Sequence, residues 1–254
     1  MININSSILQ TIIEIEKNEN IKIIHAVESG SRAWNFASPD SDYDVRFIYV
    51  RSEKDYLRLD GTSDFINWQI DDVYDINGWD ITKVLKQFYK SNPYIFEWSN
   101  SPIIYKTTDI WSEIYRVAKN YFSPRLSIAA YLGLANKTYK NDLQSESVSY
   151  KKYLYAIRPL LCCRYIEQFE SPPPVNFYDL LILLTSKELR LKIDSVLEIK
   201  QQSYESEKFP HISLIKKFIE DELSVQEKIL KEYPKSKTKS WSSLNEIFRN
   251  CIGV

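Results

Sequence analysis

Hydrophobic positions in the first part of the chain change period from one segment to the next. Isoleucine and leucine recur at helical spacing over residues 6–17, which predicts a first helix. β-Branched and aromatic residues then gather in short runs that are typical of strands, which we expect at 21–27, 42–50, 65–70 and 72–76. Helical spacing returns after Asp80, which we expect to cap a helix that ends at Asn92-Pro93.

From about residue 106 onward the pattern is helical almost throughout. We expect helices near 108–121, 124–141, 148–169, 176–185, 187–202, 211–231 and 241–250. Pro159 lies inside the third of these helices and is expected to kink it. The pattern therefore predicts an α+β protein, with a short mixed sheet and flanking helices over residues 1–105 and an α-helical region over residues 106–254.

Composition narrows the class of protein. Apolar residues make up 44% and charged residues 26% of the chain, which excludes a disordered or collagen-like protein. Lys and Arg number 33 against 34 Asp and Glu, so any basic groove for a nucleic acid must be local. The three cysteines form no disulfide framework, and we find neither a signal peptide nor an apolar run near the roughly 20 residues of a membrane span. We expect a cytoplasmic protein without membrane contact.

Two carboxylates on one predicted strand are the first candidates for chemistry. Asp42 and Asp44 are two residues apart, and because side chains alternate along a strand, both should point to the same face. Adjacent negative charges repel each other unless a cation lies between them. Carboxylate oxygens suit Mg²⁺, so this pair predicts a divalent metal site. The two histidines, in contrast, lie far apart, and His25 in its apolar strand is expected to be a core residue.

A second candidate for chemistry, a phosphate-binding segment, precedes the carboxylates in the sequence. Gly30-Ser31 follows the predicted strand 21–27 and can open a short helix. Glycine lets a ligand approach the backbone closely, and N–H groups at the start of a helix favour an anion. A phosphate held by Gly30-Ser31, beside a metal held by Asp42 and Asp44, is an arrangement suited to transfer of a phosphoryl or nucleotidyl group.

The order of these motifs resembles a known superfamily. A Gly-Ser pair, about ten residues and then Asp-x-Asp on a strand is similar to the DNA polymerase β-type nucleotidyltransferases. A bacterial and phage family within it, some of whose members are associated with RNA repair, is similar over most of residues 21–165. The segments that carry this resemblance are ESGSRAW at 28–34, DSDYDVR at 40–46, GWD at 78–80, KSNP at 90–93 and KYLYAIRPLL at 152–161.

The resemblance implies a nucleotidyltransferase core and a two-metal reaction. Gly30 and Ser31 would hold the β- and γ-phosphates of a nucleoside triphosphate, and Asp42 and Asp44 would bind two Mg²⁺ ions, with Mn²⁺ as a substitute. One ion would activate an acceptor hydroxyl and the other would stabilise the leaving pyrophosphate. A third carboxylate would complete the metal site and act as, or orient, the base. We select Asp75 for this role.

Asp72 is the rival third carboxylate. It begins the same predicted strand three residues earlier, and opposite parity means that Asp72 and Asp75 cannot both face the site on a regular strand.

Four basic residues are candidates for binding the nucleotide. Arg32 and Arg46 lie in the two motifs, where each could equally pair with a neighbouring carboxylate. Lys152 and Arg158 come from the helical region and could reach the triphosphate. Without the resemblance, both would be interpreted as charges on a helix surface.

Three questions stay open from the sequence. The acceptor hydroxyl could belong to an RNA 3′ end, a protein or a small molecule, and neither the nucleotide base nor the oligomeric state is specified.

A second class of function, besides an enzyme, is a regulatory, antitoxin-like protein that binds a nucleotide without turnover. A third is an RNA-binding repair factor that grips RNA with helices 124–141 and 148–169, for which a local basic groove would be needed.

Overall fold

The computed structural model describes residues 4–71, 73–202, 204, 207–235 and 238–253. Its internal contacts divide the chain into two compact units, and neither is continuous in sequence. The first unit is drawn from the segments 1–30, 42–122 and 238–254, and the second from 31–41 and 123–237. This division differs from the one expected at residue 105, because the motif segment 31–41, which begins within the short helix α2 (Gly30–Ala33), packs with the helical unit and the last helix packs with the sheet unit.

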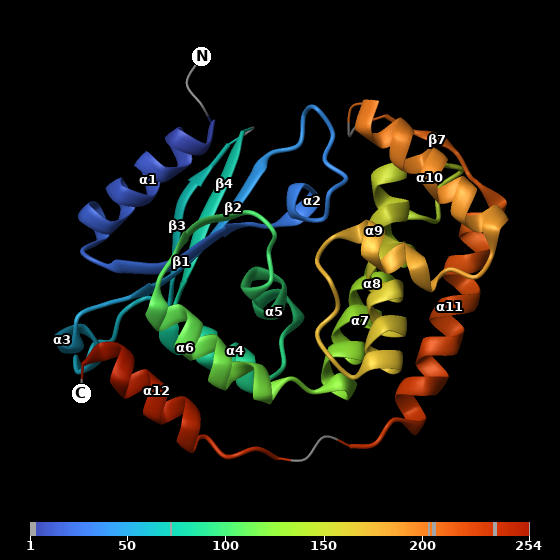
Figure 1. The fold of residues 1–254 in the computed structure, drawn as a ribbon. Coiled ribbons are helices and arrows are strands. Elements are labelled where there is room, and N and C mark those ends of the chain that lie inside the picture. The colour runs from blue at the N-terminus through green and yellow to red at the C-terminus, as the bar shows by residue number, and fades with distance from the viewer. Residues whose placement is uncertain (1–3, 72, 203, 205–206, 236–237, 254) are drawn as a thin grey trace. The chain divides into compact units, whose positions relative to one another are not determined.

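A five-stranded mixed sheet forms the centre of the first unit (Figure 1). Its strands in spatial order are β3 (Phe65–Ile70), β4 (Tyr74–Asp80), β2 (Tyr43–Val50), β1 (Lys22–Glu28) and β5 (Ile104–Thr107). The β2–β4 pair is parallel and the other pairs are antiparallel. The expected short mixed sheet is therefore confirmed, and β5 is a strand that the pattern did not predict.

Helices cover both faces of this sheet (Figure 1). On one face, Ile8, Ile12 and Ile15 of α1 (Ile4–Glu19) pack against the alternate β2 residues Val45 and Phe47. The opposite face, which carries Ile48 and Val50, is covered by α4 (Ile81–Tyr89), α5 (Pro93–Ser99) and α6 (Asp109–Ala118), and α12 (Ser242–Ile252) packs on α4 and α6. Asp80 caps α4 as expected, since its side chain accepts a hydrogen bond from the Thr82 N–H. The short helices α3 (Glu53–Tyr56) and η1 (Lys119–Tyr121) complete the unit.

The second unit is helical. Its elements are α7 (Pro124–Asp142), β6 (Ser147–Val148), α8 (Tyr150–Phe169), α9 (Phe177–Leu180), η2 (Leu181–Leu183), α10 (Lys187–Gln202), β7 (Phe209–Pro210) and α11 (Ser213–Glu232). Helix α7 packs along α8, and α11 packs against both. Pro159 lies inside α8, which continues on both sides of it. All seven helices expected after residue 106 are present in the two units, with bounds that differ by a few residues.

Candidate functional site

Two aspartates meet side by side in the sheet of the first unit. In the parallel β2–β4 pair, Asp44 lies opposite Asp75 and Arg46 lies opposite Asn77. Because side chains alternate along a strand, Asp44 and Arg46 share the face of Ile48, while Val45 and Phe47 enter the core of the other face. The strand pairing therefore brings Asp44 and Asp75 together at one end of the two central strands.

The Arg46 guanidinium joins the two carboxylates. Its Nη2 donates to Asp44 Oδ1 at 2.7 Å and to Asp75 Oδ2 at 2.6 Å. Its Nη1 donates to the backbone oxygens of Asp75 at 2.6 Å and Val45 at 3.2 Å. The side chains are only partly exposed, at 14% for Arg46, 20% for Asp44 and 27% for Asp75, so these ion pairs are screened less than surface pairs. Arg46 therefore pairs with neighbouring carboxylates, one of the two interpretations that its sequence position allowed.

Gly30 is held against the Asp44 carboxylate. Its φ is +59°, in the left-handed region that favours glycine. A Cβ at this position would lie 1.9 Å from Asp44 Oδ2, a distance that no side chain tolerates. The neighbouring Ser29 N–H donates to the Asp44 backbone oxygen at 2.8 Å, which ties the end of β1 to the start of β2. Both the backbone conformation and the close approach therefore require glycine at position 30.

A buried glutamate accepts a hydrogen bond from the Asp44 backbone, a contact that the residue pattern did not predict. Glu28 is 1% exposed, and its Oε1 accepts a hydrogen bond from the Asp44 N–H at 2.9 Å. The Tyr105 hydroxyl donates to its other oxygen, and the Ser101 hydroxyl donates to its backbone oxygen. The sequence feature that could have indicated a role for Glu28 is its place at the start of the ESGSRAW segment. The contacts indicate that Glu28 positions the Asp44 backbone.

The other two aspartates considered lie beside this pair in sequence. Asp42 is half-buried and stands one residue before β2, which begins at Tyr43 rather than at residue 42. Asp42 therefore lies outside the regular strand whose alternation predicted a shared face for Asp42 and Asp44. Asp72 falls outside the residues that the structure describes.

Four of the candidate nucleotide-binding residues belong to the second unit: Ser31, Arg32, Lys152 and Arg158. The Arg32 guanidinium donates to the Ser41 backbone oxygen, and the backbone oxygen of the buried Ser31 accepts from the Phe36 N–H. Arg158 is 3% exposed, and its guanidinium lies 4.3 Å from the ring centre of Trp34. Arg158 is thus a buried residue rather than a charge on the helix surface.

Lys152, the remaining candidate, lies near the start of α8. Its Nζ is 3.1 Å from Asp142 Oδ1, and its side chain is 40% exposed, which fits the interpretation of a paired surface charge.

The motif segment 31–41 is anchored within the helical unit at several points. The Phe36 ring packs edge-on against Phe177 at 5.5 Å, and the Phe177 N–H donates to the Trp34 backbone oxygen at 3.0 Å. The Nζ of the buried Lys200 donates to Ser38 Oγ at 3.1 Å. The Gly-Ser motif is therefore divided, because Gly30 belongs to the sheet unit and Ser31 begins the segment that packs with the helices.

The donor set fits a divalent cation in its chemistry. Among the described residues, no three His, Cys, Asp or Glu side chains stand together as a set that could hold a metal ion. Asp44 and Asp75 do converge on one positive charge, the Arg46 guanidinium, and carboxylate oxygens are the ligands that Mg²⁺ prefers. The pair can therefore offer carboxylate oxygens to a cation.

His25 is a core residue, as its apolar strand predicted. It is 3% exposed, its ring stacks on Trp111 at 4.7 Å, and its nitrogens contact Thr107 Oγ1 and the Trp98 backbone oxygen. Burial lowers the pKa of His25 from 6.5 to about 4, so the ring is neutral at physiological pH.

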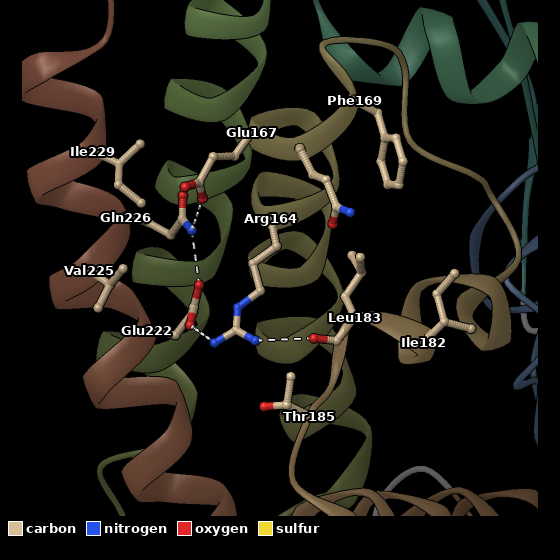
Figure 2. Close-up of a pocket in the computed structure, with 11 residues that line it drawn as sticks. Arg164, Glu167, Phe169, Ile182, Leu183, Thr185, Glu222, Val225, Gln226 and Ile229 are labelled. Atoms are coloured by element: carbon tan, nitrogen blue, oxygen red, sulfur yellow. Dashed lines mark hydrogen bonds and ion pairs between the residues drawn. The ribbon is translucent and has the colours of Figure 1, made fainter.

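A cavity of about 680 Å³ opens in the helical unit between α8, η2 and α11 (Figure 2). Arg164 and the buried Glu222 form an ion pair in it, and Gln226 donates to Glu222 at 2.9 Å. The rest of the lining is mixed, with apolar side chains such as Phe169 and Ile182 and polar ones such as Glu167 and Thr185. None of the candidate site residues lines this cavity, so the motifs do not connect it with the proposed chemistry.

This chain is similar to a protein family, to a bacterial protein and to a solved structure. A family model described as "RNA repair pathway DNA polymerase beta family" matches residues 4–250. An uncharacterized protein of Bacillus subtilis (strain 168), YcgL, is 37% identical over 247 residues, which cover 96% of this chain and 95% of that protein. A crystal structure of a nucleotidyltransferase-like protein from Exiguobacterium sibiricum matches 89% of this chain and 75% of its own, with 13% identity and a TM-score of 0.32.

Across the described residues, every helix is too short or too polar to cross a membrane.

Proposed function

Because this chain belongs to the RNA repair pathway DNA polymerase beta family, we propose that it is a Mg²⁺-dependent nucleotidyltransferase that adds a nucleoside monophosphate to an acceptor hydroxyl. The observation that carries the proposal is the convergence of Asp44 and Asp75 beside Gly30. The family description favours an RNA end as the acceptor. A protein or small-molecule hydroxyl is an alternative outcome of the test.

The reaction is an in-line displacement at the α-phosphorus of a nucleoside triphosphate. The acceptor oxygen loses its proton and forms a bond to the α-phosphorus, while the bond from that phosphorus to the oxygen bridging to the β-phosphate breaks and pyrophosphate leaves. In the proposal Asp42, Asp44 and Asp75 hold divalent ions. When bound, these ions neutralise charge on the phosphates and lower the pKa of the acceptor hydroxyl.

The chain's own residues then have separate tasks. Gly30 gives the phosphates access to the backbone, and Ser31 follows it with a hydroxyl and an N–H group. Asp75 accepts the proton of the acceptor hydroxyl or orients that hydroxyl. Glu28 keeps the Asp44 backbone in place through its hydrogen bond from the Asp44 N–H. Arg32, Lys152 and Arg158 remain candidates for binding the triphosphate.

The test is transfer of label from each α-³²P-labelled nucleoside triphosphate with Mg²⁺, alone, with total RNA and with cell lysate. Label on RNA supports the preferred acceptor, whereas label on a protein or a small molecule keeps the reaction and replaces the acceptor. No transfer to any acceptor, with triphosphate binding retained, would overturn the proposal in favour of a regulatory nucleotide-binding protein.

Replacing both motif aspartates tests the site itself. The Asp42→Asn, Asp44→Asn double variant is expected to lose at least about 10³-fold in transfer rate, since a neutral amide oxygen binds Mg²⁺ far more weakly than a carboxylate oxygen. The matched control is Asp60→Asn with Asp64→Asn, which removes the same charge from exposed ion pairs with Arg58 and Lys83. Unchanged transfer by the motif variant would refute the metal-site assignment.

A further inference from the structure

The Arg46 side chain occupies the space between the two central carboxylates. Four acceptors surround its guanidinium: Asp44 Oδ1, Asp75 Oδ2 and the backbone oxygens of Val45 and Asp75. The three side chains lie on adjacent strands whose register sets their spacing. A planar guanidinium with several N–H donors suits such a set better than the single ammonium of lysine.

A cation is required at this position. Asp44 and Asp75 lie directly opposite each other on neighbouring strands, an arrangement that is unfavourable for two like charges. Both carboxylates are more than two-thirds buried, which weakens the screening of their repulsion by water. Arg46 supplies the compensating charge from within the chain, two residues beyond Asp44 on the same face.

The other carboxylate oxygens are also oriented by the chain. Asp75 Oδ1 accepts from Asn77 Nδ2 at 3.0 Å, and Asp44 Oδ2 faces Gly30. The oxygens that Arg46 contacts are therefore those that a divalent ion shared by the two aspartates would need. A guanidinium and a divalent cation repel each other and cannot both lie between the same two oxygens.

We propose that Arg46 is a built-in counter-ion that holds Asp44 and Asp75 in position in the metal-free protein and is displaced when a divalent cation binds with the nucleotide. The inference rests on the proposed function, because it assumes that these carboxylates receive the metal. Arg46 is then a positioning residue in the metal-free protein and a ligand of the phosphates once the nucleotide has bound. Its guanidinium exchanges the carboxylates for the anionic phosphates that arrive with the cation.

This exchange couples metal binding to nucleotide binding. Without a nucleotide, a free divalent cation must compete with a guanidinium that has four acceptors, so its affinity is low. With a nucleotide bound, phosphate oxygens offer the guanidinium new acceptors, and it no longer competes with the cation for the two carboxylates. By linkage, the nucleotide raises the affinity for the cation by the same factor as the cation raises the affinity for the nucleotide.

The experiment measures Mn²⁺ binding by electron paramagnetic resonance, which reports free Mn²⁺ and needs no turnover. Wild type, Arg46→Gln and Arg46→Lys are titrated with and without a non-hydrolysable α,β-methylene nucleoside triphosphate. Arg58→Gln is the matched control, because it removes the same charge from an exposed ion pair of the same unit. Circular dichroism and thermal unfolding show that each variant is folded, and Arg46→Lys retains the charge if Arg46→Gln fails to fold.

We expect Arg46→Gln to bind Mn²⁺ at least about tenfold more tightly than wild type in the absence of nucleotide, and Arg58→Gln to match wild type. Arg46→Lys should lie between wild type and Arg46→Gln. The nucleotide should enhance Mn²⁺ affinity more in wild type than in Arg46→Gln.

Two other outcomes separate the inference from the proposed function. Equal Mn²⁺ affinity in wild type and Arg46→Gln, abolished by Asp44→Asn, would overturn the counter-ion role and leave the metal site standing. Absence of Mn²⁺ binding in every variant, even with nucleotide, would overturn the proposed function and the inference with it.

Discussion

Replacing Gly30 by alanine introduces two separable costs. The first is backbone strain, since Gly30 has a φ of +59° and an L residue pays about 1–2 kcal/mol for that conformation. The second is a collision, because the new Cβ would lie 1.9 Å from Asp44 Oδ2 where real contacts stay beyond 3.0 Å. The carboxylate must therefore move by about 1 Å, and a displacement of that size at a reacting centre can cost about 10²-fold in rate.

Gly61 provides a control for the strain alone. Its φ is +66°, and nothing lies within 4 Å of a Cβ built on it. Gly61→Ala should therefore lower the free energy of unfolding by about 1–2 kcal/mol and leave nucleotidyl transfer unchanged. Gly30→Ala should lose at least as much stability and, in addition, about 10²-fold or more in transfer rate.

Urea unfolding and the labelled-nucleotide assay, run side by side on the two variants, measure these effects. If Gly30→Ala transfers label within about threefold of Gly61→Ala, the close approach of Gly30 to Asp44 has no part in catalysis, and the reasoning from this contact is refuted.

Two further predictions concern the stability of the first unit. The buried His25 has a pKa of about 4 in the folded protein against 6.5 when unfolded, so protonation favours the unfolded chain. About 3 kcal/mol of the free energy of unfolding is therefore fully present above pH 6.5 and should be lost as the pH falls to about 4. Urea unfolding between pH 7 and pH 4 should show a shallower loss for His25→Asn, and equal slopes would contradict this account. Asp80→Ala should cost about 2–3 kcal/mol, because Asp80 accepts hydrogen bonds from the Thr82 N–H and the Tyr56 hydroxyl. Asp80→Asn, which retains a capping oxygen, should cost less in the same measurement, and equal losses would show that the cap contributes little.

The sequence predicts the helices and strands of this fold better than it predicts how they group into the two compact units. Hydrophobic periodicity found the first four strands and the long helices because it is a local signal. It missed β5 and α5, which have four and seven residues, too few for a period to appear. It could not show that the last helix returns to the sheet unit, where Leu244 and Ile247 are buried, because that contact depends on tertiary packing alone.

The candidate site was predictable in part for the same reason. Alternation along β2 places Asp44 and Arg46 on one face without any knowledge of the neighbouring strand. The position of Asp75 opposite Asp44 requires the parallel pairing of β2 with β4, which the sequence does not encode locally. The bridging role of Arg46 and the support from Glu28 follow from this pairing and from β5, so they emerge only in three dimensions.

The interrupted first unit has a consequence for how the protein is made. Synthesis proceeds from the N-terminus, so residues 123–237 are produced before α12 can pack on α4 and α6. Until then, the apolar side chains that meet Leu244 and Ile247 lack part of their cover, and the nascent chain exposes a patch that chaperones can bind. A fragment that stops at residue 122 would carry the carboxylates but not this helix, and a synthetic peptide of residues 238–254 should restore its stability.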